Sequence, residues 1–98
     1  MSFLSFFGKY LPERVVSNAE LASRIGCEPG WIQDVSGISE RRWATPEQTV
    51  ADLAVAAGQD CLKNAGLSGA DLAMIFVASG TASRRFPGPA AEVAERIG

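Results

Sequence analysis

LAMIFVA, at residues 72–78, is an uninterrupted run of seven apolar side chains. A half-exposed strand alternates polar and apolar residues, so a run without alternation predicts a central strand covered on both faces. A long helix is expected before this run, over about Thr49–Ala65, and another after it, over about Pro89–Ile97. The short run Phe3–Phe7, which ends at Gly8, predicts a further buried strand.

This order of elements, strand–helix–strand–helix, predicts an α/β fold with a parallel strand pair and a right-handed crossover. The pattern stops at a helix, and two strands make only a narrow sheet. We therefore expect the chain to be an incomplete piece of a domain, whose missing strands lie outside residues 1–98.

The long helix carries clear local signals. Thr49 can cap its first turn, and Asp52 in that turn suits the positive end of the helix dipole. Gly66 follows its end. Its expected apolar face consists of Val50, Leu53, Ala54, Ala57 and Cys61, which recur at helical spacing.

Two shorter helices are predicted nearer the N-terminus. Ser17 and Glu20 match a capping box, and the helix that they begin should end before Gly26. A second helix is expected from Pro29, where a missing N–H is harmless, to just before Gly37. The chain before these helices, residues 10–14, is expected to be a loop, and residues 38–43 a short extended stretch.

Composition narrows the possible functions. Hydrophobic residues make up 47% of the chain and charged residues 20%, which are values typical of a globular protein. The net charge of −2, without a long basic run, argues against nucleic-acid binding. With no histidine and no paired cysteine motif, a zinc site is not expected. The apolar N-terminus is too short for a membrane span, so a cytoplasmic protein with no membrane partner is expected.

The residues themselves show no catalytic group. Cys61 lies on the apolar helix face and is interpreted as a small buried hydrophobic residue, and no neighbouring residue marks Cys27 as a reactive thiol. The loop Ser79–Thr81 follows a strand but lacks a phosphate-binding signature. The charged stretch Glu40–Arg42 is expected to form surface ion pairs. No catalytic residue is therefore assigned within the chain.

An ordered set of short motifs nevertheless resembles the beginning of β-ketoacyl-acyl carrier protein synthase III. The set extends over essentially the whole chain without a required gap, and its order is more specific than any single member. Its members are Gly8–Val15, Ser17–Leu21, Trp31-Ile32, Gly37–Arg42, Thr49 onward, Ala65–Leu67, Asp71-Leu72, Ile75–Ser79 and Phe86–Gly88.

The resemblance implies a thiolase-like fold, of which residues 1–98 would form the N-terminal part of the first domain. Enzymes of this type condense an acyl-CoA primer with malonyl-acyl carrier protein in fatty acid or related biosynthesis, and they act as homodimers. Their catalytic cysteine, histidine and asparagine would all follow Gly98. The 98-residue chain alone is therefore expected to be inactive, with no cofactor beyond coenzyme A thioester as a substrate.

The resemblance also assigns roles to three residues. Trp31 matches a tryptophan that stacks on the adenine of coenzyme A, and Ser36 lies beside it in place of a common threonine. Phe86 matches a residue that reaches across the dimer interface to wall the acyl pocket. Val35 and Ser39 stand where many members carry arginine, and the loss of two cations weakens the expected grip on an anionic nucleotide. An acyl group carried by a carrier protein is therefore an alternative to acyl-CoA as the donor.

Two classes of function are compatible with these observations. The chain is either part of a condensing enzyme, or of a sibling acyltransferase on the same fold, or it is a non-catalytic module for dimerisation or acyl-carrier binding. The unpaired edge of an apolar strand argues against an independent module, because such edges promote aggregation.

Overall fold

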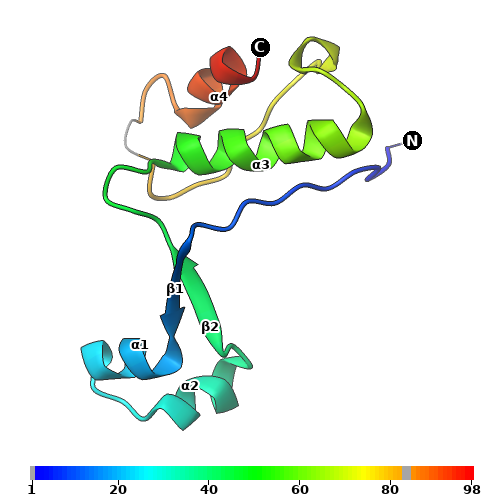
Figure 1. The fold of residues 1–98 in the computed structure, drawn as a ribbon. Helices are drawn as coiled ribbons and strands as arrows, with labels where there is room; N and C mark the ends of the chain where they lie inside the picture. Colours follow the sequence, from blue (N-terminus) through cyan, green and yellow to red (C-terminus); the bar gives the residue numbers. More distant parts are fainter. Residues whose placement is uncertain (1, 83–84) are drawn as a thin grey trace. The chain divides into compact units, whose positions relative to one another are not determined.

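The computed structural model describes residues 2–82 and 85–98. Within them the chain forms two compact units, which are described separately (Figure 1). The hairpin unit is Leu11–Thr45. The helix-pair unit combines residues 1–10 with Pro46–Gly98.

The hairpin unit consists of two short strands with two helices inserted between them. Its elements are β1 (Arg14–Ser17), α1 (Asn18–Ile25), α2 (Pro29–Ser36) and β2 (Glu40–Trp43). β1 and β2 pair antiparallel, in a register that places Arg14 opposite Trp43 and Ser17 opposite Glu40. Four apolar residues are buried in this unit: Pro12, which precedes β1, and Val16, Ala22 and Ile32, one each from β1, α1 and α2.

The predicted ends of these two helices are confirmed. The Ser17 hydroxyl accepts a hydrogen bond from the Glu20 N–H at 3.2 Å, and Gly26 and Gly37 end the helices in the left-handed conformation. That conformation is unfavourable for residues with a Cβ atom, which explains glycine at both ends. The Glu20 carboxylate pairs with Arg14 and Arg24 instead of completing the expected capping box.

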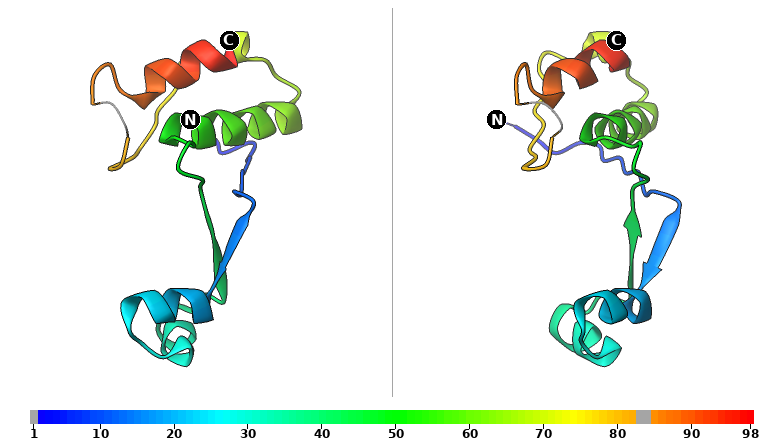
Figure 2. Two further views of the ribbon diagram at one scale, coloured as in Figure 1. Left: turned by 60° about the vertical axis from the view of Figure 1, so that its left-hand side comes forward. Right: turned by 90° about the vertical axis from the view of Figure 1, so that its left-hand side faces the viewer.

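The helix-pair unit is built around α3 (Val50–Ala65) and α4 (Pro89–Ile97), with a short 3-10 turn, η1 (Gly69–Asp71), after α3. Both views in Figure 2 show α4 lying along α3. Val93 of α4 packs against Ala51 and Val55 of α3 in a small buried core. An ion pair of 2.8 Å between Arg96 and Asp52 links the same two helices.

The most buried face of α3 is not the apolar face that the sequence predicts. Ala51 and Val55 are its buried residues, whereas the predicted apolar face is half-buried. The reason is that α3 is contacted by two segments. Gly8 approaches the backbone of Ala57 and Cys61 so closely that a Cβ atom there would collide with it. Ala57 and Cys61 of the predicted face thus meet the N-terminal segment, whereas Ala54 packs with Ala51 and Val55 in the core shared with α4.

The two predicted strands of the parallel pair are not formed. Neither Phe3–Phe7 nor Leu72–Ala78 is a strand, and the only sheet among residues 2–82 and 85–98 is the antiparallel β1–β2 pair. Ile75 and Val77 pack against the α3–α4 core, but Phe76, at 87% exposure, faces outward. The prediction of burial on both faces was therefore wrong for this chain.

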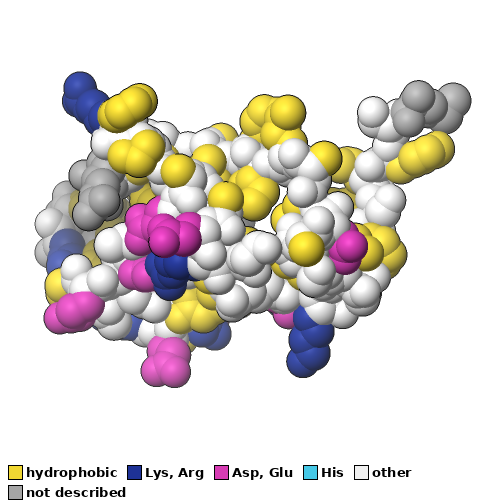
Figure 3. All heavy atoms as spheres, turned by 90° about the horizontal axis from the view of Figure 1, so that it is seen from above, with side chains coloured by type: hydrophobic (Ala, Val, Ile, Leu, Met, Phe, Trp, Pro, Cys, Tyr) yellow, Lys and Arg dark blue, Asp and Glu magenta, His cyan; other side chains and the backbone are white. Residues whose placement is uncertain are grey.

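The physical reason is that an extended segment becomes a strand only when a neighbour satisfies its backbone hydrogen bonds. No such neighbour is present among the described residues. The result is a small α/β chain with hydrophobic side chains on its surface, several of which are visible in Figure 3. None of its described helices has the length and hydropathy needed to cross a membrane.

Candidate functional site

Helix α2 presents an apolar outer face. Ile32 is buried beneath the helix, whereas Trp31 is 56% exposed and Val35, one turn later, is 62% exposed. Pro29 occupies the first turn, where its fixed backbone angle favours the start of a helix. The sequence pattern therefore positions a flat, accessible indole ring near the beginning of a short helix, a geometry suited to stacking on a planar ligand.

Ser36 uses its hydroxyl to close the C-terminal end of α2. The hydroxyl donates to the Ile32 carbonyl oxygen at 2.5 Å and accepts from the Ile38 N–H at 3.1 Å. Ser39, just beyond the helix, donates to the Gln33 side-chain oxygen at 2.9 Å. Ser36 thus links α2 to the residue after Gly37. Its role in binding a nucleotide stays a prediction.

Asn18 joins this turn to the start of α1, a contact that the sequence analysis missed. Its Nδ2 donates to the Ile38 carbonyl oxygen at 2.8 Å, and its Oδ1 accepts from Arg41 at 2.7 Å. Its backbone N–H donates to the Ser39 carbonyl oxygen at 3.3 Å. Asn18 lies within the Ser17–Leu21 motif, but no local pattern indicates these contacts, because its partners are about twenty residues away in the chain.

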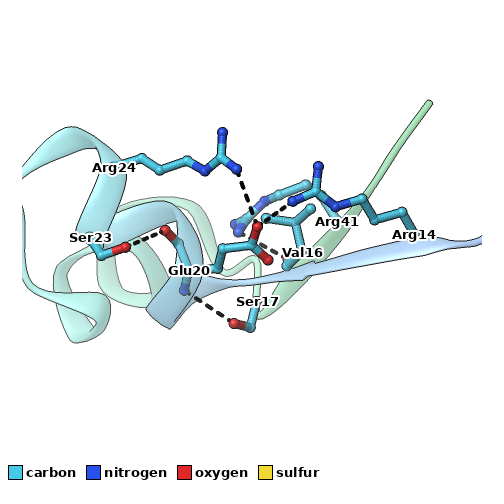
Figure 4. Close-up of polar contacts among 7 residues, drawn as sticks. All are labelled: Arg14, Val16, Ser17, Glu20, Ser23, Arg24 and Arg41. Atoms are coloured by element: carbon cyan, nitrogen blue, oxygen red, sulfur yellow. Dashed lines mark hydrogen bonds and ion pairs between the residues drawn. The ribbon is translucent and has the colours of Figure 1, made fainter. Parts of the chain in front are cut away.

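The arginines of β2 have internal partners. Arg41 donates to the Val16 carbonyl oxygen at 3.3 Å, as Figure 4 shows, in addition to its contact with Asn18. Arg42 donates to the Pro12 carbonyl oxygen at 3.0 Å. The expectation of surface ion pairs for these two residues was wrong, since both bind backbone carbonyl groups within the hairpin unit.

Two other arginines gather around Trp43. The guanidinium carbons of Arg14 and Arg24 each lie 5.1 Å from the centroid of its ring, within the range of cation–π attraction. Both arginines also pair with the Glu20 carboxylate, which lies between them in Figure 4. This cluster ties β1, α1 and β2 together.

The remaining predicted site residue, Phe86, belongs to the helix-pair unit. It is 92% exposed and precedes Pro87 through a cis peptide bond. The structure therefore places Trp31 and Ser36 on one helix of one unit and Phe86 in the other unit.

A shallow apolar groove of about 360 Å³ lies in the helix-pair unit, between the helices and the 72–78 segment. Cys61, a free thiol, is half-buried in its wall. The other cysteine, Cys27, is also a free thiol and half-buried. No group of three potential metal ligands occurs in the part of the chain that the structure describes.

The chain is similar in sequence to known proteins of one type. No protein-family model matches the chain. It is 44% identical over 91 residues to acetoacetyl CoA synthase NphT7 of Streptomyces sp. (strain CL190). The aligned region covers 93% of this chain and 28% of that protein. It is 42% identical over 91 residues to β-ketoacyl-[acyl-carrier-protein] synthase III of Staphylococcus haemolyticus, which covers 93% of this chain and 29% of that protein.

The fold is also similar to solved structures. The priming β-ketosynthase of the R1128 polyketide biosynthetic pathway matches with a TM-score of 0.87 and 32% sequence identity, over 94% of this chain and 28% of that chain. The chain thus spans less than a third of the length of each of these relatives.

Proposed function

Because this chain has the sequence and the thiolase-type fold of the N-terminal part of synthase III-like condensing enzymes, we propose that it is part of a ketoacyl synthase. The proposed enzyme transfers an acyl primer from a thioester to an enzyme cysteine. It then joins the acyl group to the carbanion released by decarboxylation of malonyl-acyl carrier protein. The continuous similarity over 91 residues carries this proposal.

Within that enzyme, Trp31 is proposed to bind the remote end of the acyl donor. Its ring is accessible on α2, and stacking requires only a flat, partly exposed aromatic face. The catalytic groups, which form no part of residues 1–98, would act on the thioester at the other end. Trp31 would therefore contribute to donor affinity rather than to the chemical step.

The donor is either an acyl-CoA or an acyl group on a carrier protein. Val35 supplies an exposed apolar side chain one turn after Trp31, where a cation would favour the phosphates of coenzyme A. This observation favours testing both donors.

Kinetics of the full-length protein test the proposal. We expect Trp31→Ala to raise KM for acyl-CoA about tenfold with little change in kcat, since a stacking contact remote from the reaction is removed. Ile25→Ala, which removes a 58% exposed apolar side chain from α1, is the matched control and should change neither constant. An unchanged KM for acyl-CoA in folded Trp31→Ala would contradict the coenzyme A role. If Trp31→Ala changes KM only when the acyl group is supplied on a carrier protein, the donor is an acyl-carrier protein and not acyl-CoA.

Other outcomes distinguish the alternatives. Acyl transfer without condensation would indicate a sibling acyltransferase. Binding of an acyl carrier protein without any turnover would indicate a non-catalytic module.

Phe86 is proposed to line the acyl pocket of the partner subunit in a homodimer. Its 92% exposure leaves the ring available to another surface. Phe86→Ala should then shift selectivity toward longer acyl chains, measured as the ratio of kcat/KM values for two primers. Leu67→Ala, at an exposed position after α3, should leave that ratio unchanged. An unchanged ratio in Phe86→Ala would contradict the assignment.

A cytoplasmic location is part of the same proposal. Both cysteines are free thiols, a state that a reducing compartment maintains.

A further inference from the structure

We propose that Asn18 is a positioning residue for Trp31, through which the start of α1 fixes the orientation of α2. This inference rests on the proposed function of Trp31. It assigns Asn18 no contact with the acyl donor, and the residue would act on donor binding only through the placement of α2.

Helix α2 has little of its own to hold it in place. It is eight residues long, and helices of that length are marginal without tertiary contacts. Only Ile32 is buried, and Glu28 provides no side-chain hydrogen bond at the N-terminal end. The orientation of the Trp31 ring therefore depends on what holds the C-terminal end of α2, which lies about 7.5 Å from Trp31 along the helix axis.

That end is held by contacts to residue 18. The Nδ2 of Asn18 donates to the Ile38 carbonyl oxygen at 2.8 Å, and its backbone N–H donates to the Ser39 carbonyl oxygen at 3.3 Å. Ile38 is in turn bound to the last residue of α2, since its N–H donates to the Ser36 hydroxyl. A continuous path of hydrogen bonds thus joins the first turn of α1 to the last turn of α2.

Arg41 fixes which way the Asn18 amide points. A guanidinium has only donors, so the group that faces it at 2.7 Å must be the acceptor Oδ1. The other amide atom, the donor Nδ2, then faces the Ile38 carbonyl oxygen. Arg41 is itself held by the Val16 carbonyl oxygen of β1, which Figure 4 shows.

Two substitutions separate positioning from simple support of the fold. Asn18→Ala removes both side-chain contacts. Asn18→Asp keeps the acceptor for Arg41, and strengthens it with a charge, but sets a second acceptor against the Ile38 carbonyl oxygen. If the hydrogen bond from Asn18 to the Ile38 carbonyl oxygen positions α2, both variants should bind the acyl donor more weakly.

In the full-length enzyme, each variant should raise KM for acyl-CoA about threefold to tenfold, the effect of one hydrogen bond, with kcat within about twofold. KM for malonyl-acyl carrier protein should not change. Asn64→Ala is the matched control, because Asn64 also donates from Nδ2 to a carbonyl oxygen, that of Phe7 at 3.0 Å, but in the helix-pair unit.

A double-mutant cycle gives the decisive measurement. If Asn18 acts through Trp31, Asn18→Ala should add less than about twofold to KM in a Trp31→Ala background. Additive effects, or a wild-type KM in Asn18→Asp, would overturn the inference while leaving the role of Trp31 intact. If Trp31→Ala alone has no effect on KM, both the donor site and this inference are wrong. Should Asn18→Ala fail to fold, Asn18→Asp, which keeps the Arg41 contact, carries the same cycle.

Discussion

Asp52 shows how one carboxylate can serve two elements. It accepts a hydrogen bond from the Thr49 N–H at 2.7 Å at the start of α3 and pairs with Arg96 of α4. The hydrogen bond from the Thr49 backbone, followed by the Arg96 side chain, lowers the pKa of Asp52 below its ordinary value. The folded state therefore favours the charged form.

The sign of the pH dependence follows directly. A lowered pKa gives a stabilising contribution that is complete above the unfolded value, about 3.9, and is lost as pH falls through the folded value. We expect Asp52→Asn to speed hydrogen exchange of the first-turn amides of α3 at pH 6. The difference from wild type should shrink at pH 3.

Asp34→Asn, in α2, is the matched control and should leave exchange in α3 unchanged at both pH values. A difference for Asp52→Asn that is as large at pH 3 as at pH 6 would show that its charge does not stabilise α3.

At the scale of elements, the N-terminal segment is attached to α3 at several points. The Lys9 N–H donates to the Asp60 carboxylate at 3.0 Å, and Asn64 donates to the Phe7 carbonyl oxygen at 3.0 Å. Between these contacts, Gly8 lies against the backbone of α3. A backbone cannot move aside as a flexible side chain can, so the absence of a Cβ atom is what permits this approach.

Gly8→Ala should therefore separate the segment from α3. We expect a loss of about 1–3 kcal/mol in the free energy of unfolding, typical of overpacking, together with faster hydrogen exchange at Lys9. Gly30→Ala is the matched control, since a Cβ atom there meets nothing within 4 Å, and it should be neutral or slightly stabilising. Equal stabilities of the two variants would contradict the close approach.

At the scale of the whole molecule, the exposed hydrophobic side chains are the dominant feature. Seven apolar residues are buried in the described part of the chain, whereas large ones such as Phe3, Leu4 and Phe76 are between 78% and 88% exposed. The extended segments that carry them also have backbone groups available for pairing. Exposed edges of this kind promote association between chains.

The 98-residue chain expressed alone should therefore form oligomers in size-exclusion chromatography and show a broad thermal transition. The same residues within the proposed longer enzyme should not, because the further strands of that enzyme would cover these segments. A monodisperse monomer with a sharp, cooperative melt would contradict this expectation and favour a stand-alone module.

The sequence by itself determined the helices and indicated which family the chain resembles. Ser17, Pro29, Thr49 and Pro89 each mark a helix start, and the structure begins helices at or directly after these residues. Such signals are local, because a cap acts within one turn of the residue that provides it. The ordered motifs similarly indicated the resemblance to synthase III-type proteins that the comparisons show.

Only the tertiary structure decided the strands and the support of the candidate site. Whether residues 72–78 form a strand depends on a neighbour elsewhere in the chain, and apolar periodicity says nothing about whether that neighbour is present. The β1–β2 pair and the link from Asn18 to Ile38 both join residues about twenty or more positions apart. Contacts over such separations leave no local pattern, because they depend on how the whole chain folds.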